Sequence, residues 1–361
     1  MRVLLKKLFL FTFIPALCWG LIDAILPITF FTHRHHEAIT FQSIVPAKTK
    51  MYPNISSSMD AVGDLAYYTK YEIIKHETWK TDKLGYRNDE FIEDPDILFI
   101  GDSFIEGSSL NQNQTISNNV SKKLKQVKVY NMAPCNFNEF IKYLKIGVIK
   151  KPKLIIFSSV ERNVPDMIAN HISENNPVEN LLNNAFSFNN INIYIDKALK
   201  LYSVNWIRAR INGTKGIGIQ SGINPNMFFY KGINQKYNPE DLSSTTKVLL
   251  AYKKYCDSLG IYFLFLPIPN KETVYYELVP FEKQPNYLLR LDSLLKNSNI
   301  PSINTLKIYN DYRISNTKLL YHFDDTHWNS NGVEIISNEI INKLNTTPQL
   351  DCFSSEFLLK K

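Results

Sequence analysis

Four short apolar runs occur along the chain, and each is followed by residues with the spacing of a helix. The runs are DILFIGDS at Asp96, VKVYNMA at Val127, KLIIFSSV at Lys153 and IYFLFLPIP at Ile261. They are continuous rather than alternating, which is typical of parallel strands buried on both faces. The pattern therefore predicts an α/β fold, in which one parallel sheet is doubly wound with helices on both faces.

Three intervening segments have the apolar spacing of amphipathic helices. They begin at Thr115, Phe137 and Ser244, and the third ends at Gly260, a residue type that favours helix ends. Doubly wound sheets place their sites beyond the carboxyl ends of the strands. Ser103, in the stretch ILFIGDSFIEG, lies just past one predicted strand end.

The N-terminus has a different pattern. After Arg2, Lys6 and Lys7, the residues from Leu8 to Phe31 are almost all apolar. A bilayer core needs roughly 20 such residues in a helix. We expect residues 1–31 to be a single-pass cell-membrane anchor, with its positive end in the cytoplasm and the rest of the chain outside. A cleaved signal peptide is the alternative, although the run is longer than a signal core and no small-x-small site closes it.

The remaining chain divides by its pattern into three parts. Residues 32–80 begin polar and aperiodic, as a juxtamembrane tether and lead-in. Residues 81–346 carry the strand-helix alternation, interrupted by an Asn-rich insertion at 164–243 that we expect to cap the site or touch a partner. Residues 347–361 form a C-terminal tail.

Composition excludes several classes of function. The charge of +7 comes from 41 Lys and Arg against 34 Asp and Glu, spread along the chain without a basic aromatic stripe, which argues against a nucleic-acid partner. Outside the anchor only Cys135, Cys256 and Cys352 remain, and no CxxC pair suggests zinc or a disulfide framework. We expect no cofactor and no resident metal.

The candidate chemistry begins with Ser103. A serine between a strand end and a helix start exposes its hydroxyl and keeps its own N–H free. Gly-Asp-Ser alone is also ordinary capping chemistry, so a base is needed. His327, in YHFDDTHWNSNG, follows Asp324 and Asp325 closely enough for one turn to supply a base and the carboxylate that orients it.

The combination of FIGDSFIEG with DDTHWNSNG resembles the SGNH (GDSL-type) hydrolase superfamily, and within it the SGNH-like domain of alginate and other cell-surface polysaccharide O-acetyltransferases. The segments at Thr81, Phe157 and Leu266 are similar to further motifs of that group. The resemblance covers residues 80 to 345, approximately. It implies a three-layer flavodoxin-like fold.

The resemblance also implies roles for individual residues. Ser103 matches the nucleophile and His327 the base. The Asp-Thr-His-Trp pattern selects Asp325 as the triad acid, whereas the Asp-x-x-His pattern of ordinary GDSL esterases selects Asp324, and we prefer Asp325. The Asp102 side chain is expected to cap the following helix instead.

The oxyanion hole departs from the family pattern. Asn136 stands where a glycine N–H usually donates, and Arg162 and Asn163 stand where an Asn amide usually does. We expect these three residues to bind an oxyanion or substrate, with an ion pair between Glu161 and Arg162 as the purely structural alternative. Because of this departure, a family member that binds its ligand without catalysing a reaction is an alternative.

The leading functional expectation is a membrane-anchored, extracytoplasmic O-acetyltransferase that acts on a cell-surface or exported polysaccharide through an acyl-Ser103 intermediate. No cytosolic thioester donor reaches that side unaided, so the resemblance implies a membrane-bound acyltransferase partner. The alternatives are an extracytoplasmic carbohydrate acetyl esterase and a non-catalytic glycan-binding or scaffold subunit. A metal site of His322, Asp324, Asp325 and His327 is the most remote alternative.

Overall fold

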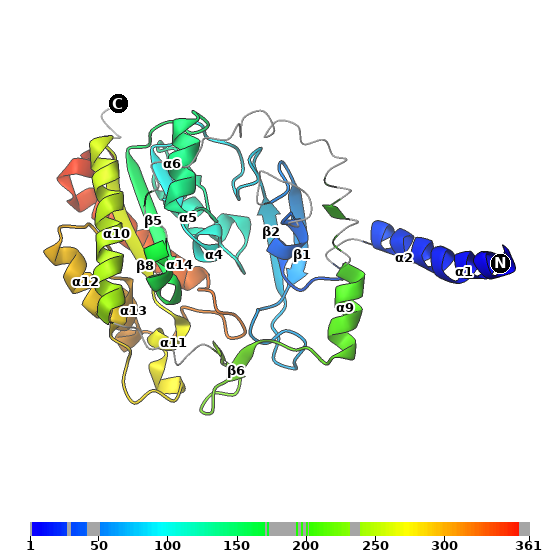
Figure 1. Ribbon diagram of the computed structural model, residues 1–361. Helices are drawn as coiled ribbons and strands as arrows, with labels where there is room; N and C mark the ends of the chain where they lie inside the picture. Colours follow the sequence, from blue (N-terminus) through cyan, green and yellow to red (C-terminus); the bar gives the residue numbers. More distant parts are fainter. Residues whose placement is uncertain are drawn as a thin grey trace.

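The computed structural model consists of a mixed α/β body from which an N-terminal helix projects (Figure 1). The described residues are 2–26, 30–41, 51–169, 172, 193, 196–197, 200, 202–231 and 239–353.

The centre of the body is a four-stranded sheet, and all its neighbouring strands are parallel. Its order is β4-β3-β5-β8. Its strands are β3 (Ile97–Ile100), β4 (Val129–Asn131), β5 (Leu154–Val160) and β8 (Tyr262–Ile268). Each strand arises from one predicted apolar run, and every residue in them except Tyr262 is buried. The prediction of a parallel sheet covered on both faces is therefore confirmed.

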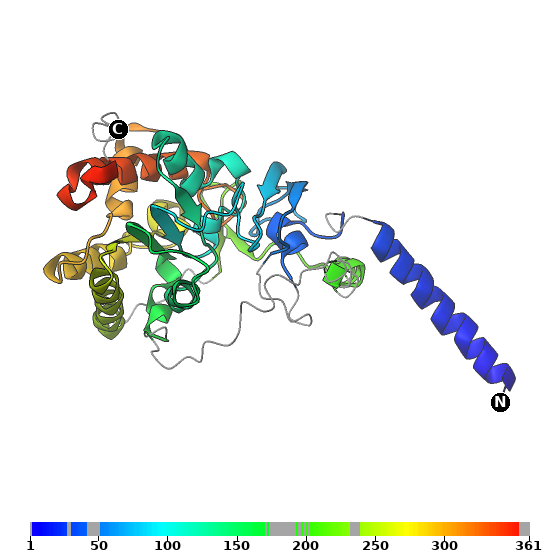
Figure 2. The same cartoon turned by 90° about the horizontal axis from the view of Figure 1, so that it is seen from above.

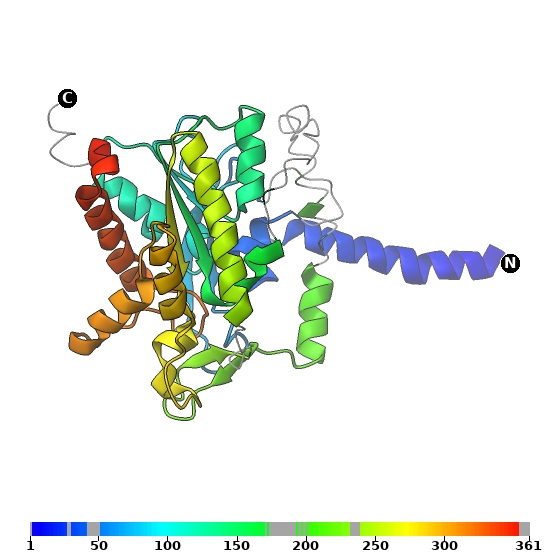
Figure 3. The same ribbon diagram turned by 60° about the vertical axis from the view of Figure 1, so that its left-hand side comes forward.

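Helices cover the two faces of this sheet. On one face α6 and α10 lie side by side (Figure 3), and the rings of Phe137 and Tyr252 stack between them with centroids 4.0 Å apart. On the other face α5 packs against α14. In Figure 2 these two helices lie on the side of the sheet opposite to α6 and α10. These helices are α5 (Ile116–Lys123), α6 (Phe137–Lys145), α10 (Pro239–Ser258) and α14 (Ser330–Thr346). The layering is compatible with a flavodoxin-like fold.

The strand order creates a topological switch point beside β3. The chain leaves β3 toward β4 on one side of it, and then crosses to β5 and β8 on the other side. In open α/β sheets, the crevice beyond the carboxyl ends of the strands at such a point is where ligands bind. Ser103 follows β3 at that position.

An antiparallel hairpin stands beside this body, within the segment expected to be a tether and lead-in. Its strands are β1 (Ser56–Ala61) and β2 (Lys75–Lys80), preceded by α3 (His35–Ile39). Trp79 is buried in a small separate core with residues from α3 and β1. The segment 51–80 is thus folded, although its polar, alternating strands gave no strong strand signal.

The expected insertion, 164–243, lies partly outside the described residues. Within it the structure has a helix and a second hairpin, in which β6 pairs with β7. The backbone N–H of Phe228 in β7 donates to the carbonyl of Phe323, at 3.0 Å, so the hairpin contacts the loop that carries His327. The elements are α9 (Tyr202–Ile211), β6 (Gly218–Gln220) and β7 (Phe228–Tyr230).

The remaining short elements connect these parts. They are α4 (Ser103–Glu106), η3 (Gln112–Gln114), η4 (Glu161–Asn163), η5 (Pro165–Ala169), α11 (Lys271–Val274), η6 (Tyr276–Leu278), α12 (Tyr287–Asn297), α13 (Thr305–Ser315) and η7 (Pro348–Phe353).

The N-terminal helix consists of α1 (Arg2–Leu8), η1 (Phe9–Phe13) and α2 (Ile14–Ile25). Within it, Val3–Ile22 is long and apolar enough to cross a membrane, with a mean hydropathy of 1.6, and none of it is buried inside the protein. A signal sequence has the same properties. The helix ends before the predicted limit at Phe31, because Leu26 has an extended backbone and precedes a proline.

Candidate active site

The turn after β3 presents Ser103 at the start of α4. Asp102 is the residue that caps this helix: its Oδ1 accepts from the N–H of Phe104 at 3.0 Å. Its Oδ2 accepts from the N–H of Val160 at 3.0 Å, so the same side chain ties the turn to the end of β5. Asp102 is therefore a structural residue of the turn, and it leaves the Ser103 side chain directed elsewhere.

Ser103 meets His327 across a sequence separation of 224 residues. The Ser103 Oγ lies 2.8 Å from His327 Nε2, which is hydrogen-bond distance. The ring of Phe104 packs against the imidazole with centroids 4.8 Å apart, and against Trp328 at 5.6 Å. His327 itself is buried. Aromatic packing and burial therefore hold the imidazole in place against the hydroxyl.

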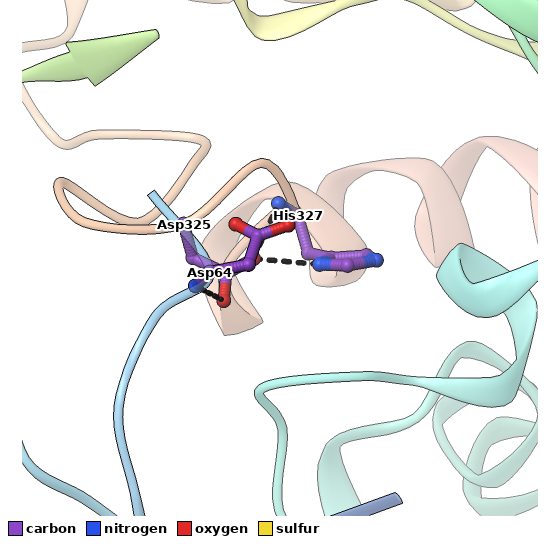
Figure 4. Close-up of side chains that lie close together, drawn as sticks. All are labelled: Asp64, Asp325 and His327. Carbon is purple, nitrogen blue, oxygen red and sulfur yellow. Dashed lines mark hydrogen bonds and ion pairs between the residues drawn. The ribbon is translucent and has the colours of Figure 1, made fainter. Parts of the chain in front are cut away.

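Asp325 lies on the other side of the imidazole (Figure 4). Its Oδ1 accepts from His327 Nδ1 at 2.6 Å and from the His327 backbone N–H at 2.8 Å. Its Oδ2 accepts from Ser109 Oγ at 2.7 Å and from the Asp64 N–H at 3.2 Å. Burial by itself would raise the pKa of Asp325, but the charge of His327 and the hydrogen bond from it hold that pKa well below its usual value.

Asp324 points away from this arrangement. Its Oδ1 lies 2.9 Å from Lys75 Nζ, and its Oδ2 accepts from the N–H groups of Gly63 at 2.9 Å and Ile73 at 3.0 Å. The two adjacent carboxylates thus have separate partners. Only Asp325 orients the imidazole, whereas Asp324 anchors the loop to the β1–β2 hairpin.

Asp64 is a buried part of this site that the sequence analysis missed. Its Oδ1 accepts from the N–H of Thr326 and its Oδ2 from the Thr326 hydroxyl, both at 2.9 Å. Burial, and then the charge of Asp325, raises the pKa of Asp64. The preceding Gly63 approaches the loop so closely that an added Cβ would lie 2.1 Å from the carbonyl oxygen of Asp324. The only signal in the sequence was a Gly-Asp pair inside an apolar stretch.

A metal ion is the other ligand to test against these residues. Asp64, Asp325 and His327 offer ligand atoms within 4.8 Å of one another. The carboxylates, however, already accept N–H and O–H groups of the protein, and His327 Nδ1 bonds directly to Asp325 rather than to a shared central point. The arrangement of Asp64, Asp325 and His327 therefore fits a hydrogen-bonded network better than a cation site. The set expected around His322 and Asp324 is not brought together, because Asp324 bonds to Lys75.

Two buried cations that the sequence analysis did not single out support the loops. Lys271 begins α11 after β8, and its Nζ donates to the carbonyls of Phe323 at 2.9 Å and Asp325 at 3.1 Å. Burial lowers the pKa of Lys271 to about 8. Arg87 stacks on the Trp79 ring and donates to the carbonyl of Leu110 at 2.6 Å, in the segment that follows Ser103.

Asn136 does not have the geometry expected of an oxyanion donor. Its N–H, the group assigned to that role, donates to the Glu139 carboxylate at 2.9 Å. Its side chain accepts from the N–H of Glu139 at 2.9 Å, which completes a capping box at the start of α6. The backbone N–H and the side-chain oxygen of Asn136 are therefore both used in capping α6, and the residue is exposed.

Arg162 lies closer to the nucleophile turn. Its guanidinium carbon is 5.7 Å from the ring centroid of Phe104 and 5.6 Å from that of Tyr230, and its Nη1 donates to Asn270 Oδ1 at 3.4 Å. The side chain is half-buried, so its charge is accessible beside the residue that follows Ser103.

The ion pair proposed between Glu161 and Arg162 does not form. Glu161 is fully buried, and its Oε2 accepts from the Asn270 N–H at 2.9 Å and from Thr273 Oγ1 at 2.7 Å. Its Oε1 has no hydrogen-bond partner in the described part of the chain. Burial raises the pKa of Glu161 to about 7. Asn163 is exposed beyond it.

The backbone N–H of Ser103 is also placed beside the candidate nucleophile. This N–H has no acceptor among the described residues, whereas the N–H groups of Phe104, Ile105 and Glu106 all bond to Asp102. The site therefore combines a free N–H at the hydroxyl-bearing residue with a nearby guanidinium. Such donors stabilise negative charge that develops on a carbonyl oxygen.

The chain has little similarity to known proteins. No protein-family model matches the chain, and no curated protein matches it. Among solved structures, it is similar to a crystal structure described as "a putative acylhydrolase" from Bacteroides fragilis NCTC 9343, with a TM-score of 0.34 and 10% sequence identity, over 69% of this chain and 85% of that one.

Proposed function

We propose that the protein is a serine acyl-transfer enzyme of the SGNH type, in which Ser103 is the nucleophile, His327 the general base and Asp325 the residue that orients the base. The observation that carries the proposal is a continuous chain of hydrogen bonds. It runs from Ser103 Oγ to His327 Nε2 at 2.8 Å and from His327 Nδ1 to Asp325 Oδ1 at 2.6 Å. An imidazole oriented in this way is what a serine hydroxyl requires at neutral pH.

In the first half of the reaction, the Ser103 Oγ attacks the carbonyl carbon of an ester while its proton passes to His327 Nε2. Asp325 holds the Nδ1 proton and stabilises the imidazolium that forms. The negative charge on the former carbonyl oxygen is stabilised by the Ser103 N–H and the Arg162 guanidinium. The leaving alcohol takes the proton back from His327 as the ester bond breaks, and an acyl-Ser103 ester remains.

In the second half, a hydroxyl group passes its proton to His327 and attacks the acyl-Ser103 carbonyl. The bond between the acyl carbon and Ser103 Oγ then breaks, and Ser103 Oγ takes the proton from His327. If the attacking hydroxyl belongs to water, the enzyme is an esterase, and if it belongs to a sugar, the enzyme is an acyltransferase. We propose a sugar of an exported or cell-surface polysaccharide, with an acetyl group supplied by a membrane-bound acyltransferase. The Asp-Thr-His-Trp motif and the apolar N-terminal helix, with Lys6 and Lys7 at its cytoplasmic end, support this choice.

The experiment is a comparison of the full-length chain with Ser103→Ala. Both are reconstituted in lipid and incubated with a chromogenic acetyl ester, with and without oligosaccharide acceptors. Wild type should turn over the ester and be labelled by a serine-directed phosphonate, whereas Ser103→Ala should do neither. Faster turnover with an acceptor, together with acetylated oligosaccharide, identifies a transferase, and acetate release alone identifies an esterase. A wild-type chain that neither turns over the ester nor reacts with the phosphonate would leave only a binding or scaffold role, and equal turnover by wild type and Ser103→Ala would overturn the assignment of Ser103.

A further inference from the structure

Helix α9 differs from the other long helices of the body, because its apolar side chains remain uncovered by the protein. Ser203 is the one residue of α9 that is buried. Trp206 and Ile207 are half-exposed, and Ile211 at its end is 79% exposed. A helix that presents apolar side chains in this way needs another surface to cover them.

The start of α9 contacts the end of the candidate membrane span. Trp19 Nε1 donates to Ser203 Oγ at 2.8 Å, and Trp19 lies just before Ile22, the last residue of the span. The ring of Trp206 lies 6.4 Å from Phe30 and 6.5 Å from Phe31, between centroids. These aromatic rings gather at the level where the span ends, and aromatic side chains are typical of the membrane–water interface.

Helix α9 lies across the direction of the N-terminal helix. In Figures 1 and 3, α9 runs across the direction of α1 and α2, and in Figure 2 it is seen almost end-on while α1 and α2 run lengthwise. The two helices are therefore roughly perpendicular. If α1 and α2 cross a bilayer, α9 lies parallel to its surface, which is the orientation of an interfacial helix.

The residues of α9 and those just after it carry charge of one sign. No acidic residue occurs between Asp196 and Glu240, whereas Arg208, Arg210 and Lys215 are exposed on α9 and just after it. Apolar side chains with basic neighbours are the combination that binds the interface of a membrane containing anionic lipids.

We propose that α9 forms a membrane-docking surface, which binds anionic phospholipid headgroups and the acyl boundary of the bilayer that the N-terminal helix crosses. The proposal rests on the proposed membrane anchor, but it does not depend on the acyl chemistry. Because α9 leads along the chain into β6 and β7, and β7 bonds to the loop at Phe323, docking of α9 holds the Ser103 site in one orientation relative to the membrane.

The test places an environment-sensitive fluorophore at position 211 of the full-length chain. Cys18→Ser and Cys352→Ser remove the more accessible native thiols, and Cys135 and Cys256 are buried. Ile211→Cys provides the attachment point. Ile314→Cys is the matched control, because Ile314 is 85% exposed on α13, on the opposite side of the body in Figure 1. Both labelled chains are reconstituted in phosphatidylcholine vesicles with and without phosphatidylglycerol, and with a lipid-borne quencher.

The proposal predicts a blue-shifted emission at position 211 that the lipid quencher reduces, most strongly with phosphatidylglycerol, and a solvent-like, unquenched emission at position 314. Arg208→Gln with Lys215→Gln should remove the phosphatidylglycerol effect, whereas Lys145→Gln with Lys318→Gln should keep it. A solvent-like signal at position 211, or a shielded signal that the lipid quencher does not reach, as contact with a second copy would produce, overturns the proposal.

Alkaline extraction of the same vesicles separates the two ideas. If the chain stays with the lipid and position 211 is unquenched, the anchor stands and the docking surface is wrong. If the chain is released, the anchor is wrong and the docking surface falls with it.

Discussion

Asp325 accepts two hydrogen bonds from His327, one from the ring Nδ1 at 2.6 Å and one from the backbone N–H at 2.8 Å. A single carboxylate oxygen thereby fixes both the position of the residue and the orientation of its ring. Asp324, its immediate neighbour, contributes to neither bond and pairs with Lys75 instead. Because the two carboxylates have different partners, substitutions of Asp324 and of Asp325 should have different effects.

Asp325→Asn should lower kcat for ester turnover by roughly 10³- to 10⁴-fold, because an amide no longer favours the required tautomer or stabilises the imidazolium. Asp324→Asn should lower the free energy of unfolding by roughly 3 kcal/mol and change kcat little, because it leaves the largely buried Lys75 without its charged partner. Steady-state kinetics and urea unfolding of both variants check this. Equal losses of kcat would show that the loop moves as a whole and that the assignment of Asp325 is wrong.

Asp64 is predicted to be a positioning residue, because it holds Thr326, next to His327, through two hydrogen bonds. In Asp64→Asn only the amide oxygen still accepts, so one of the bonds is lost. We expect kcat to fall on the order of tenfold to a hundredfold while KM changes little, because the base is misplaced and substrate binding is not. Thr326→Val removes the hydroxyl bond alone and should show the smaller effect. A change in KM with kcat retained would place Asp64 in substrate binding.

Glu161 is predicted to make stability depend on pH. Its pKa is raised by burial from 4.5 to about 7, so the folded protein keeps a proton that the unfolded chain releases. Its contribution is fully present below pH 4.5 and is lost as the pH rises through 7. As the pH rises from 4.5 to 8, wild type should lose this contribution and Glu161→Gln should not. The free energy of unfolding of Glu161→Gln, relative to that of wild type, should therefore rise by roughly 3 kcal/mol over this range.

Urea unfolding across this pH range measures the effect of Glu161→Gln. The exposed Glu334→Gln is the control and should follow wild type at every pH. A constant difference between Glu161→Gln and wild type at all pH values would mean that Glu161 is ionised in the folded protein throughout.

Arg162 is predicted to stabilise charge on the substrate. Arg162→Ala should reduce kcat/KM on the order of a hundredfold, because it removes a cation beside the residue that follows Ser103. Arg162→Lys should recover part of this loss, since the charge remains but the planar group between Phe104 and Tyr230 does not. The exposed Arg290→Ala serves as the control. If Arg162→Ala has full activity, the oxyanion must rely on backbone donors.

The parallel sheet was determined by local sequence. Continuous apolar runs such as ILFI in β3 and LIIF in β5 can be buried only inside a covered sheet, so their pattern predicted both the strands and their surroundings. The order of the chain then placed Ser103 at the carboxyl edge. The motif around His327 suggested its partner, although nothing local required the two to meet.

Tertiary structure decided the rest, because it depends on segments that are distant in sequence. Asp324 and Asp325 are chemically identical neighbours, and Lys75, Gly63 and Ile73, which the β1–β2 hairpin brings to the loop, turn Asp324 away from His327. Asp64 was missed for the same reason, since its partner lies 262 residues later. The chemistry of a side chain can be read from a sequence, whereas the direction in which it points is set by what packs against it.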